Sequence, residues 1–127
     1  MEIKIAIAKI DTHGKGTSGD TVEVTERPNG GISIVLADGQ IDNRESKAIS
    51  TMVAHRVIDQ ISEGVRDGAS IRIAAHSIYT EHQGKVLANL SVLSVDLQTN
   101  TIIISRNNTM PAFLISEETV DCLSSES

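Results

Sequence analysis

Two predicted strands and the turn between them occupy residues 20–39, which read DTVEVTERPNGGISIVLADG. Residues 20–26 alternate valine with polar side chains, a period of two that is typical of a half-buried strand. Residues 32–37 are almost continuously apolar and predict a central strand covered on both faces, which stops at the following Asp-Gly pair. Asn29-Gly30 favours a hairpin turn, because these residues tolerate positive φ angles. We therefore expect an antiparallel ribbon here.

Outside this ribbon the spacing of the apolar residues changes between a strand-like and a helical period. Residues 1–10 alternate isoleucine with charged or small residues and predict a strand. Helical spacing begins at Arg44, with Asn43 as the expected N-cap, and ends at Gly64. A second helix is expected at about 68–82, and three further strands are expected at 85–97, 101–107 and 110–115. Ser116 to Ser127 is acidic and rich in serine, which predicts a tail or a truncated linker.

The order of these elements defines the fold class. Three strands, two helices and three strands do not follow the strict alternation of a doubly wound sheet, so the sequence predicts an α+β domain. Ile and Val together supply 27 residues, whereas Tyr79 and Phe113 are the only aromatic residues. This bias predicts a sheet-rich core built from aliphatic side chains. We expect antiparallel sheets, with the two helices inserted between the third and fourth strands.

Length and charge exclude several classes of protein. A chain of 127 residues is one domain, and its net charge of −6 disfavours binding to nucleic acid or to an anionic membrane surface. No apolar run is long enough to span a bilayer. The lone Cys122 cannot form an intrachain disulfide, which fits a reducing compartment. We therefore expect a cytoplasmic protein with no nucleic-acid and no membrane partner.

Two acidic residues are expected at one end of the ribbon. Asp20 lies nine residues before Asn29 and Asp38 lies eight residues after Gly30, so both fall at the open end of the hairpin. Two carboxylates at one sheet edge repel each other unless a cation lies between them. Mg²⁺ or Mn²⁺ suits such a site, with the Gly39 carbonyl as a further ligand. The alternative is that the Asp-Gly pair only turns the chain and that Asp20 is solvated.

Other motifs carry weaker signals. Residues 14–19 match the G-x-G-x-x-G spacing, but a dinucleotide site needs a helix at the last glycine and a strand is predicted there. Arg106-Asn107-Asn108 closes a predicted strand and suits either a phosphate pocket or, more simply, a turn. The four histidines show no shared metal-ligand spacing; they are His13, His55, His76 and His82.

Several motifs resemble the SpoIIE branch of the PP2C-like serine/threonine phosphatases. They follow the order of that branch over about residues 3–115. They are SGDTVE at 18–23, ERPNGG at 26–31, VLADGQ at 35–40, EGVRDGA at 63–69, LSVDL at 93–97 and ISRNN at 104–108. The resemblance implies part of a PP2C-like α-β-β-α sandwich over residues 1–115, followed by the acidic tail at 116–127.

The resemblance also implies an activity. It is the metal-dependent hydrolysis of phosphoserine or phosphothreonine on a regulatory phosphoprotein, such as an anti-anti-sigma-like regulator of a sigma-factor switch. Asp38, the Gly39 carbonyl and Asp20 would bind Mn²⁺ or Mg²⁺, and two ions are expected in the complete domain. Family members continue beyond the position of Ser127 into a half that supplies further metal ligands, so this chain alone is expected to be inactive.

Two alternatives follow from the same resemblance. The chain could instead be a non-catalytic pseudophosphatase or a protein-interaction module of a signalling switch. In either case exposed strand edges and an isoleucine-rich face recruit partners. We expect the chain to form homo-oligomers or to pair with a separate C-terminal half, through residues such as Ile102, Ile104 and Leu114.

Overall fold

The described part of the chain has a mixed α+β fold, with antiparallel sheets and two helices. A computed structural model describes residues 3–8, 19–28 and 30–123. The elements in chain order are β1 (Asp20–Glu26), β2 (Ile32–Ile41), β3 (Arg44–Glu45), α1 (Lys47–Ser62), α2 (Asp67–Glu81), β4 (Val86–Asp96), β5 (Thr101–Arg106), β6 (Ala112–Ile115) and β7 (Val120–Leu123). None of the helices in these described ranges is long and apolar enough to cross a membrane.

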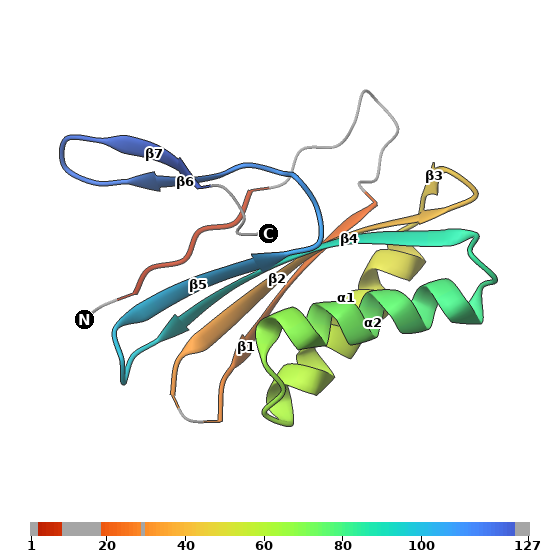
Figure 1. The fold of residues 1–127 in the computed structure, drawn as a ribbon, viewed down its shortest axis with the longest axis horizontal. Coiled ribbons are helices and arrows are strands. Elements are labelled where there is room, and N and C mark those ends of the chain that lie inside the picture. Colours follow the sequence, from red (N-terminus) through yellow and green to blue (C-terminus); the bar gives the residue numbers. More distant parts are fainter. Residues whose placement is uncertain (1–2, 9–18, 29, 124–127) are drawn as a thin grey trace.

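The main sheet is antiparallel throughout. Its strands lie in the order β1-β2-β4-β5, and the short β3 pairs with β2 beside β1 (Figure 1). The predicted hairpin of β1 and β2 is confirmed, with Glu26 opposite Ile32 at its closed end. Gly30 and Gly31 both have positive φ angles. A Cβ atom on Gly31 would lie 2.3 Å from the Val95 carbonyl oxygen, so this turn requires glycine for space as well as conformation.

Both helices cover the same face of this sheet, as Figure 1 shows. Side chains alternate along each strand, so Val35 and Ala37 of β2 face the helices together with Leu90 and Val92 of β4. From the helices, the core receives Ile49, Val53, Ala54, Val57, Ile61, Ile71, Ala74 and Ile78. Burying each of the larger aliphatic side chains contributes about 1.5–3 kcal/mol to folding. We call the opposite face, which the helices do not cover, the open face.

The end of β2 differs from the prediction. The strand does not stop at Asp38-Gly39 but continues to Ile41, and the chain turns at Asp42 and Asn43, which have φ angles of 49° and 65°. Both central residues of this β2–β3 turn therefore adopt the positive φ that two-residue hairpins require, and Asp and Asn tolerate it better than most residues. The prediction that Asp38-Gly39 ends the strand is wrong.

The start of the first helix also differs. The helix begins at Lys47 rather than at Arg44, because Arg44 and Glu45 form β3. Ser46 is the N-cap and its hydroxyl accepts a hydrogen bond from the Ile49 amide, the usual role of serine at this position. Asn43 is therefore a turn residue and not the N-cap. The predicted end at Gly64 is confirmed by its φ of 91°, just after the C-cap Glu63.

The remaining helix and strands lie close to their predicted bounds, with two exceptions. Residues 3–8 of the predicted strand 1–10 form no strand, because no described strand hydrogen-bonds with them, and the other residues of that range lie outside the described part. Residues 120–123, for which no strand was predicted, form β7. It pairs with β6 in a separate two-stranded sheet, on the open-face side of β5.

A buried polar cluster joins the hairpin turn to α2 and β4. Arg27 Nη1 lies 2.7 Å from Asp67 Oδ1 and 2.7 Å from the Ser33 hydroxyl. The Ser94 hydroxyl donates a hydrogen bond to Asp67 Oδ2 and lies 2.7 Å from the Ser33 hydroxyl. Asp67 is the first residue of α2 and is 6% exposed. Its charge therefore has both a guanidinium partner and the positive end of a helix dipole.

Replacing Asp67 tests this cluster. We expect Asp67→Asn to lower the free energy of unfolding by about 3 kcal/mol, because Arg27 loses its partner in a mostly buried position. Urea denaturation measures this value. Asp59→Asn removes an exposed carboxylate from α1 and should cost less than about 0.5 kcal/mol. A loss below about 1 kcal/mol for Asp67→Asn would contradict a stabilising role for the ion pair.

Candidate functional site

Asp20 and Asp38 lie directly opposite each other at the open end of the β1–β2 hairpin. Residues that face each other across an antiparallel pair point to the same side of the sheet. Thr21 and Ala37, the next pair, face the helices, so the two carboxylates belong to the open face. This confirms the predicted juxtaposition of the two acids. Directly opposed like charges destabilise a strand pair unless something compensates them.

The same row continues onto β4. Asp38 lies opposite Asn89, which places an amide on the open face beside the carboxylate pair. Glu45 of β3 lies on the other side of β2, and its negative charge raises the pKa of Asp38. Polar side chains therefore surround Asp38 on the open face. Asn89 and Glu45 were not predicted as site residues, although the alternation along 85–97 would have placed Asn89 on this face.

The electrostatic environment of Asp38 is unusual for an aspartate. Burial raises the pKa of Asp38 from 3.8 to about 6, and the charge of Asp20, a hydrogen bond between the two side chains and the charge of Glu45 act in the same direction. Asp38 Oδ1 is buried and has no hydrogen-bond partner among the described residues. A buried acceptor without a donor is costly, so this oxygen is suited to a cation or a proton.

Gly39 connects the site to the first helix. Its carbonyl oxygen accepts a hydrogen bond of 2.8 Å from the Ser46 amide, at the N-cap of α1. A Cβ atom at position 39 would lie 2.6 Å from the Ser50 amide nitrogen, so only glycine lets the helix approach. This close packing is a sufficient reason for glycine at position 39, whether or not its carbonyl binds a metal ion. The role of the Gly39 carbonyl as a metal ligand stays a prediction.

Lys47 brings a positive charge to the same end of the hairpin. Its Nζ donates a hydrogen bond of 2.5 Å to the backbone oxygen of Asp20. Lys47 is the first residue of α1, so the position of the helix also fixes this ammonium group beside the backbone at the start of β1. Lys47 was not predicted as a site residue, because its contact joins residues that are 27 positions apart.

The donor set suits a hard divalent cation. Carboxylate and amide oxygens are the ligands that Mg²⁺ and Mn²⁺ prefer. In the described ranges, no group of three or more His, Cys, Asp or Glu side chains gathers in a way that could hold a metal ion. Asp20 and Asp38 therefore fit as part of a metal site rather than as a complete one, and the amide of Asn89, opposite Asp38, is a neutral oxygen donor on the same face.

Asn107 and His55 make contacts with neighbouring strands that need no ligand. The Asn107 side chain accepts a hydrogen bond from the Leu90 amide and donates one to the Ala88 carbonyl, so it extends the pairing of β4 beyond β5. His55 Nε2 lies 3.4 Å from a carboxylate oxygen of Glu23 on the surface. A strand follows Gly19, as predicted, so the helix of a dinucleotide site is missing there. His13 and residues 14–18 lie outside the described residues.

No family model matches this sequence, and a search of curated proteins found no relative. A function for this chain is therefore inferred from the geometry of the open face and from its sequence motifs.

The raised pKa of Asp38 predicts how stability depends on pH when divalent cations are removed with EDTA. The folded chain holds this proton up to about pH 6 and the unfolded chain only to about 3.8, so the contribution of Asp38 to stability is lost as the pH rises through that window. We expect Asp38→Asn to melt about 3 °C above the wild type at neutral pH and to match it near pH 4. Thermal unfolding across the pH range measures both.

The control for this measurement is Asp59→Asn, which replaces an exposed aspartate on α1. Its melting temperature should follow that of the wild type at every pH. If Asp38→Asn were less stable than the wild type at neutral pH, Asp38 would instead have a favourable partner when charged.

Proposed function

We propose that this chain contributes part of the metal site of a SpoIIE-type, PP2C-like phosphatase domain that acts on phosphoserine or phosphothreonine in a regulatory protein. The observation that carries the proposal is the position of Asp20 opposite Asp38 on the open face, with Asp38 Oδ1 buried and without a described hydrogen-bond partner. The motifs that resemble this branch include both of these residues.

The arrangement of the layers supports the finer fold. Arg106 of β5, which faces the open side opposite Ser91, donates a hydrogen bond of 2.9 Å from Nη2 to the Leu123 carbonyl of β7. The β6–β7 sheet therefore lies on the side of the main sheet opposite the helices. We interpret it as part of the second sheet of a PP2C-like α-β-β-α sandwich.

Each residue of the site would have its own role in binding the cation. Asp20 and Asp38 bind the cation with carboxylate oxygens, and Asn89 offers an amide oxygen or orients a water molecule beside them. Lys47 holds the end of β1 in place through the Asp20 carbonyl. A bound Mn²⁺ or Mg²⁺ supplies a water of lowered pKa and positive charge for the phosphoryl group.

Binding of Mn²⁺ is the direct test. With Mn²⁺ at ten times its dissociation constant, we expect the wild-type chain to gain about 1.4 kcal/mol of stability, a rise of about 4–6 °C in melting temperature. Asp38→Asn and Asp20→Asn should each abolish this rise, because each removes half of the carboxylate pair. Asp59→Asn should keep it. An equal rise in Asp38→Asn would contradict the site.

Catalysis is a separate question from metal binding. Two-metal hydrolysis needs more anionic ligands than two carboxylates provide, so we expect the chain alone to show no Mn²⁺-dependent turnover of a phosphoserine peptide. Release of inorganic phosphate measures this. Turnover that Asp38→Ala abolishes would contradict the prediction and would show that this chain contains a complete centre.

A second candidate is a non-catalytic interaction module. The exposed apolar side chains of the β6–β7 hairpin favour it, since Phe113 and Ile115 of β6 are 61% and 74% exposed. A two-stranded hairpin is only marginally stable on its own. Absence of Mn²⁺ binding, together with self-association of the chain, would favour this function over the first.

A further inference from the structure

The edge strand β5 lacks the usual protection against pairing with another strand. It lies at one end of the main sheet, and no further strand among the described residues pairs with it. Its sequence from Thr101 is TIIISR, with no charged residue before Arg106 and no proline. The opposite edge strand, β1, carries Asp20, Glu23 and Glu26. Charged residues on an edge strand discourage pairing with a strand of another molecule. β5 is therefore the edge that is better able to form such a pair.

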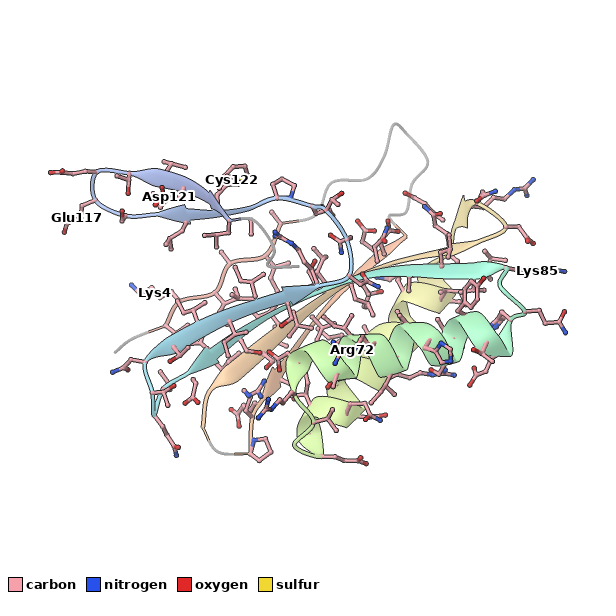
Figure 2. All side chains as sticks on the ribbon, viewed as in Figure 1. Lys4, Arg72, Lys85, Glu117, Asp121 and Cys122 are labelled. Carbon is pink, nitrogen blue, oxygen red and sulfur yellow. The ribbon has the colours of Figure 1, made fainter. Side chains whose placement is uncertain are left out.

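A groove runs beside β5. It has a volume of about 1040 Å³ and is lined by Ile102 and Ile104 of β5, by Ile71 of α2, and by Phe113 and Leu114 of β6. Arg72 of α2 also lines it, and in Figure 2 this residue and Cys122 of β7 lie on opposite sides of β5. The groove is therefore a slot between the helical layer and the β6–β7 hairpin, open along the free edge of the strand.

The sequence of β5 is complementary to itself. In a two-fold antiparallel pair whose axis passes through Ile103, Ile103 faces its own copy, Ile102 faces Ile104, and Thr101 faces Ser105. Each facing pair then lies on one side of the joined sheet, as strand geometry requires. Isoleucine meets isoleucine on both faces, and the hydroxyl side chains meet at the ends.

We propose that a second copy of this chain occupies the groove, with β5 of each copy paired antiparallel about a two-fold axis at Ile103. The interface is isologous, so each β5 lies in the groove of the other copy and the assembly closes as a dimer. Each copy's Phe113 and Leu114 line the groove into which the other strand enters, so they add apolar contacts to the backbone hydrogen bonds of the strand pair.

The exposed area agrees with a dimer interface. Ile102, Ile103 and Ile104 are 59%, 50% and 37% exposed, and Phe113 and Leu114 are 61% and 51% exposed. If a large apolar side chain has about 200 Å² of surface, these five expose roughly 500 Å² per copy. Backbone and groove walls add to this, and a standard interface buries about 800 Å² per partner.

This dimer leaves the acidic pair accessible. Asp20 lies on β1, which is the opposite edge of the main sheet, with β2 and β4 between it and β5. The dimer therefore does not depend on metal binding, and its test is performed in EDTA.

Sedimentation velocity of the full chain across a concentration series tests the proposal. We expect a monomer–dimer equilibrium with a dissociation constant in the micromolar range. Ile103→Lys places two ammonium groups opposite each other at the axis and should weaken dimerisation at least about tenfold, with unchanged circular dichroism. Val24→Lys is the matched control, a half-exposed residue on the open face of β1 given the same charge. It should leave the dimer intact.

Two outcomes of this experiment would overturn the proposal. One is a wild-type chain that stays monomeric at about 100 µM, since an apolar interface of standard size binds more tightly than that. The other is a dimer that Val24→Lys dissociates and Ile103→Lys does not, because the copies would then pack through their open faces.

Disulfide cross-linking tests the register independently of charge, in a Cys122→Ser background. Ile103→Cys should cross-link to its own copy under mild oxidation, because the two Cα atoms at the axis lie within the span of a disulfide. Ile102→Cys faces Ile104 of the other copy and should cross-link far less. Efficient cross-linking of Ile102→Cys and none of Ile103→Cys would overturn the proposed axis.

Discussion

The ion pair between Arg27 and Asp67 fixes the relation between the hairpin, the helices and the central strand. Arg27 follows β1 at the turn, Asp67 begins α2, and both contact the Ser94 hydroxyl of β4. Because a charge buried without its partner is costly, the hairpin cannot slide along β4 without breaking these contacts. A slip of one residue would also turn Val35 and Ala37 away from the helices. The position of Asp38 at the other end of β2 follows from the same register.

The two faces of the sheet serve different purposes. The helix face carries the apolar core. Near the end of β2 on this face, Gly39 has no side chain and so lets the start of α1 approach the strand. The open face carries the acidic pair. The start of α1 fixes the backbone around the carboxylates, because the Ser46 amide donates to the Gly39 carbonyl and Lys47 donates to the Asp20 carbonyl. A precise placement of the site is therefore a consequence of how α1 packs.

Much of this fold could be predicted from local sequence signals, and the errors of the prediction have physical causes. The hairpin, both helices and the strands β4 and β5 follow from period and turn residues, which act over a few positions. The continuation of β2 past Gly39 was missed because an Asp-Gly pair is a common turn signal, whereas here the glycine serves helix packing. The ion pair between Arg27 and Asp67 joins residues 40 positions apart, so no local pattern in the sequence predicts it. For the site, counting along the hairpin was sufficient for Asp20 and Asp38, whereas Asn89 required the pairing of β2 with β4.

The acidic pair is better explained by binding than by stability. Two opposed carboxylates, one with a buried oxygen that lacks a described donor, weaken the folded state of a chain whose net charge is already −6. An asparagine or a threonine at position 38 would fit the strand at lower cost, so packing gives no reason for a second carboxylate. The cation that we propose for this site would reverse the balance, because both carboxylates would then be attracted to the ion. Positions that break the local rules of a sheet without a structural gain are where function is expected, and the open end of the hairpin is such a position.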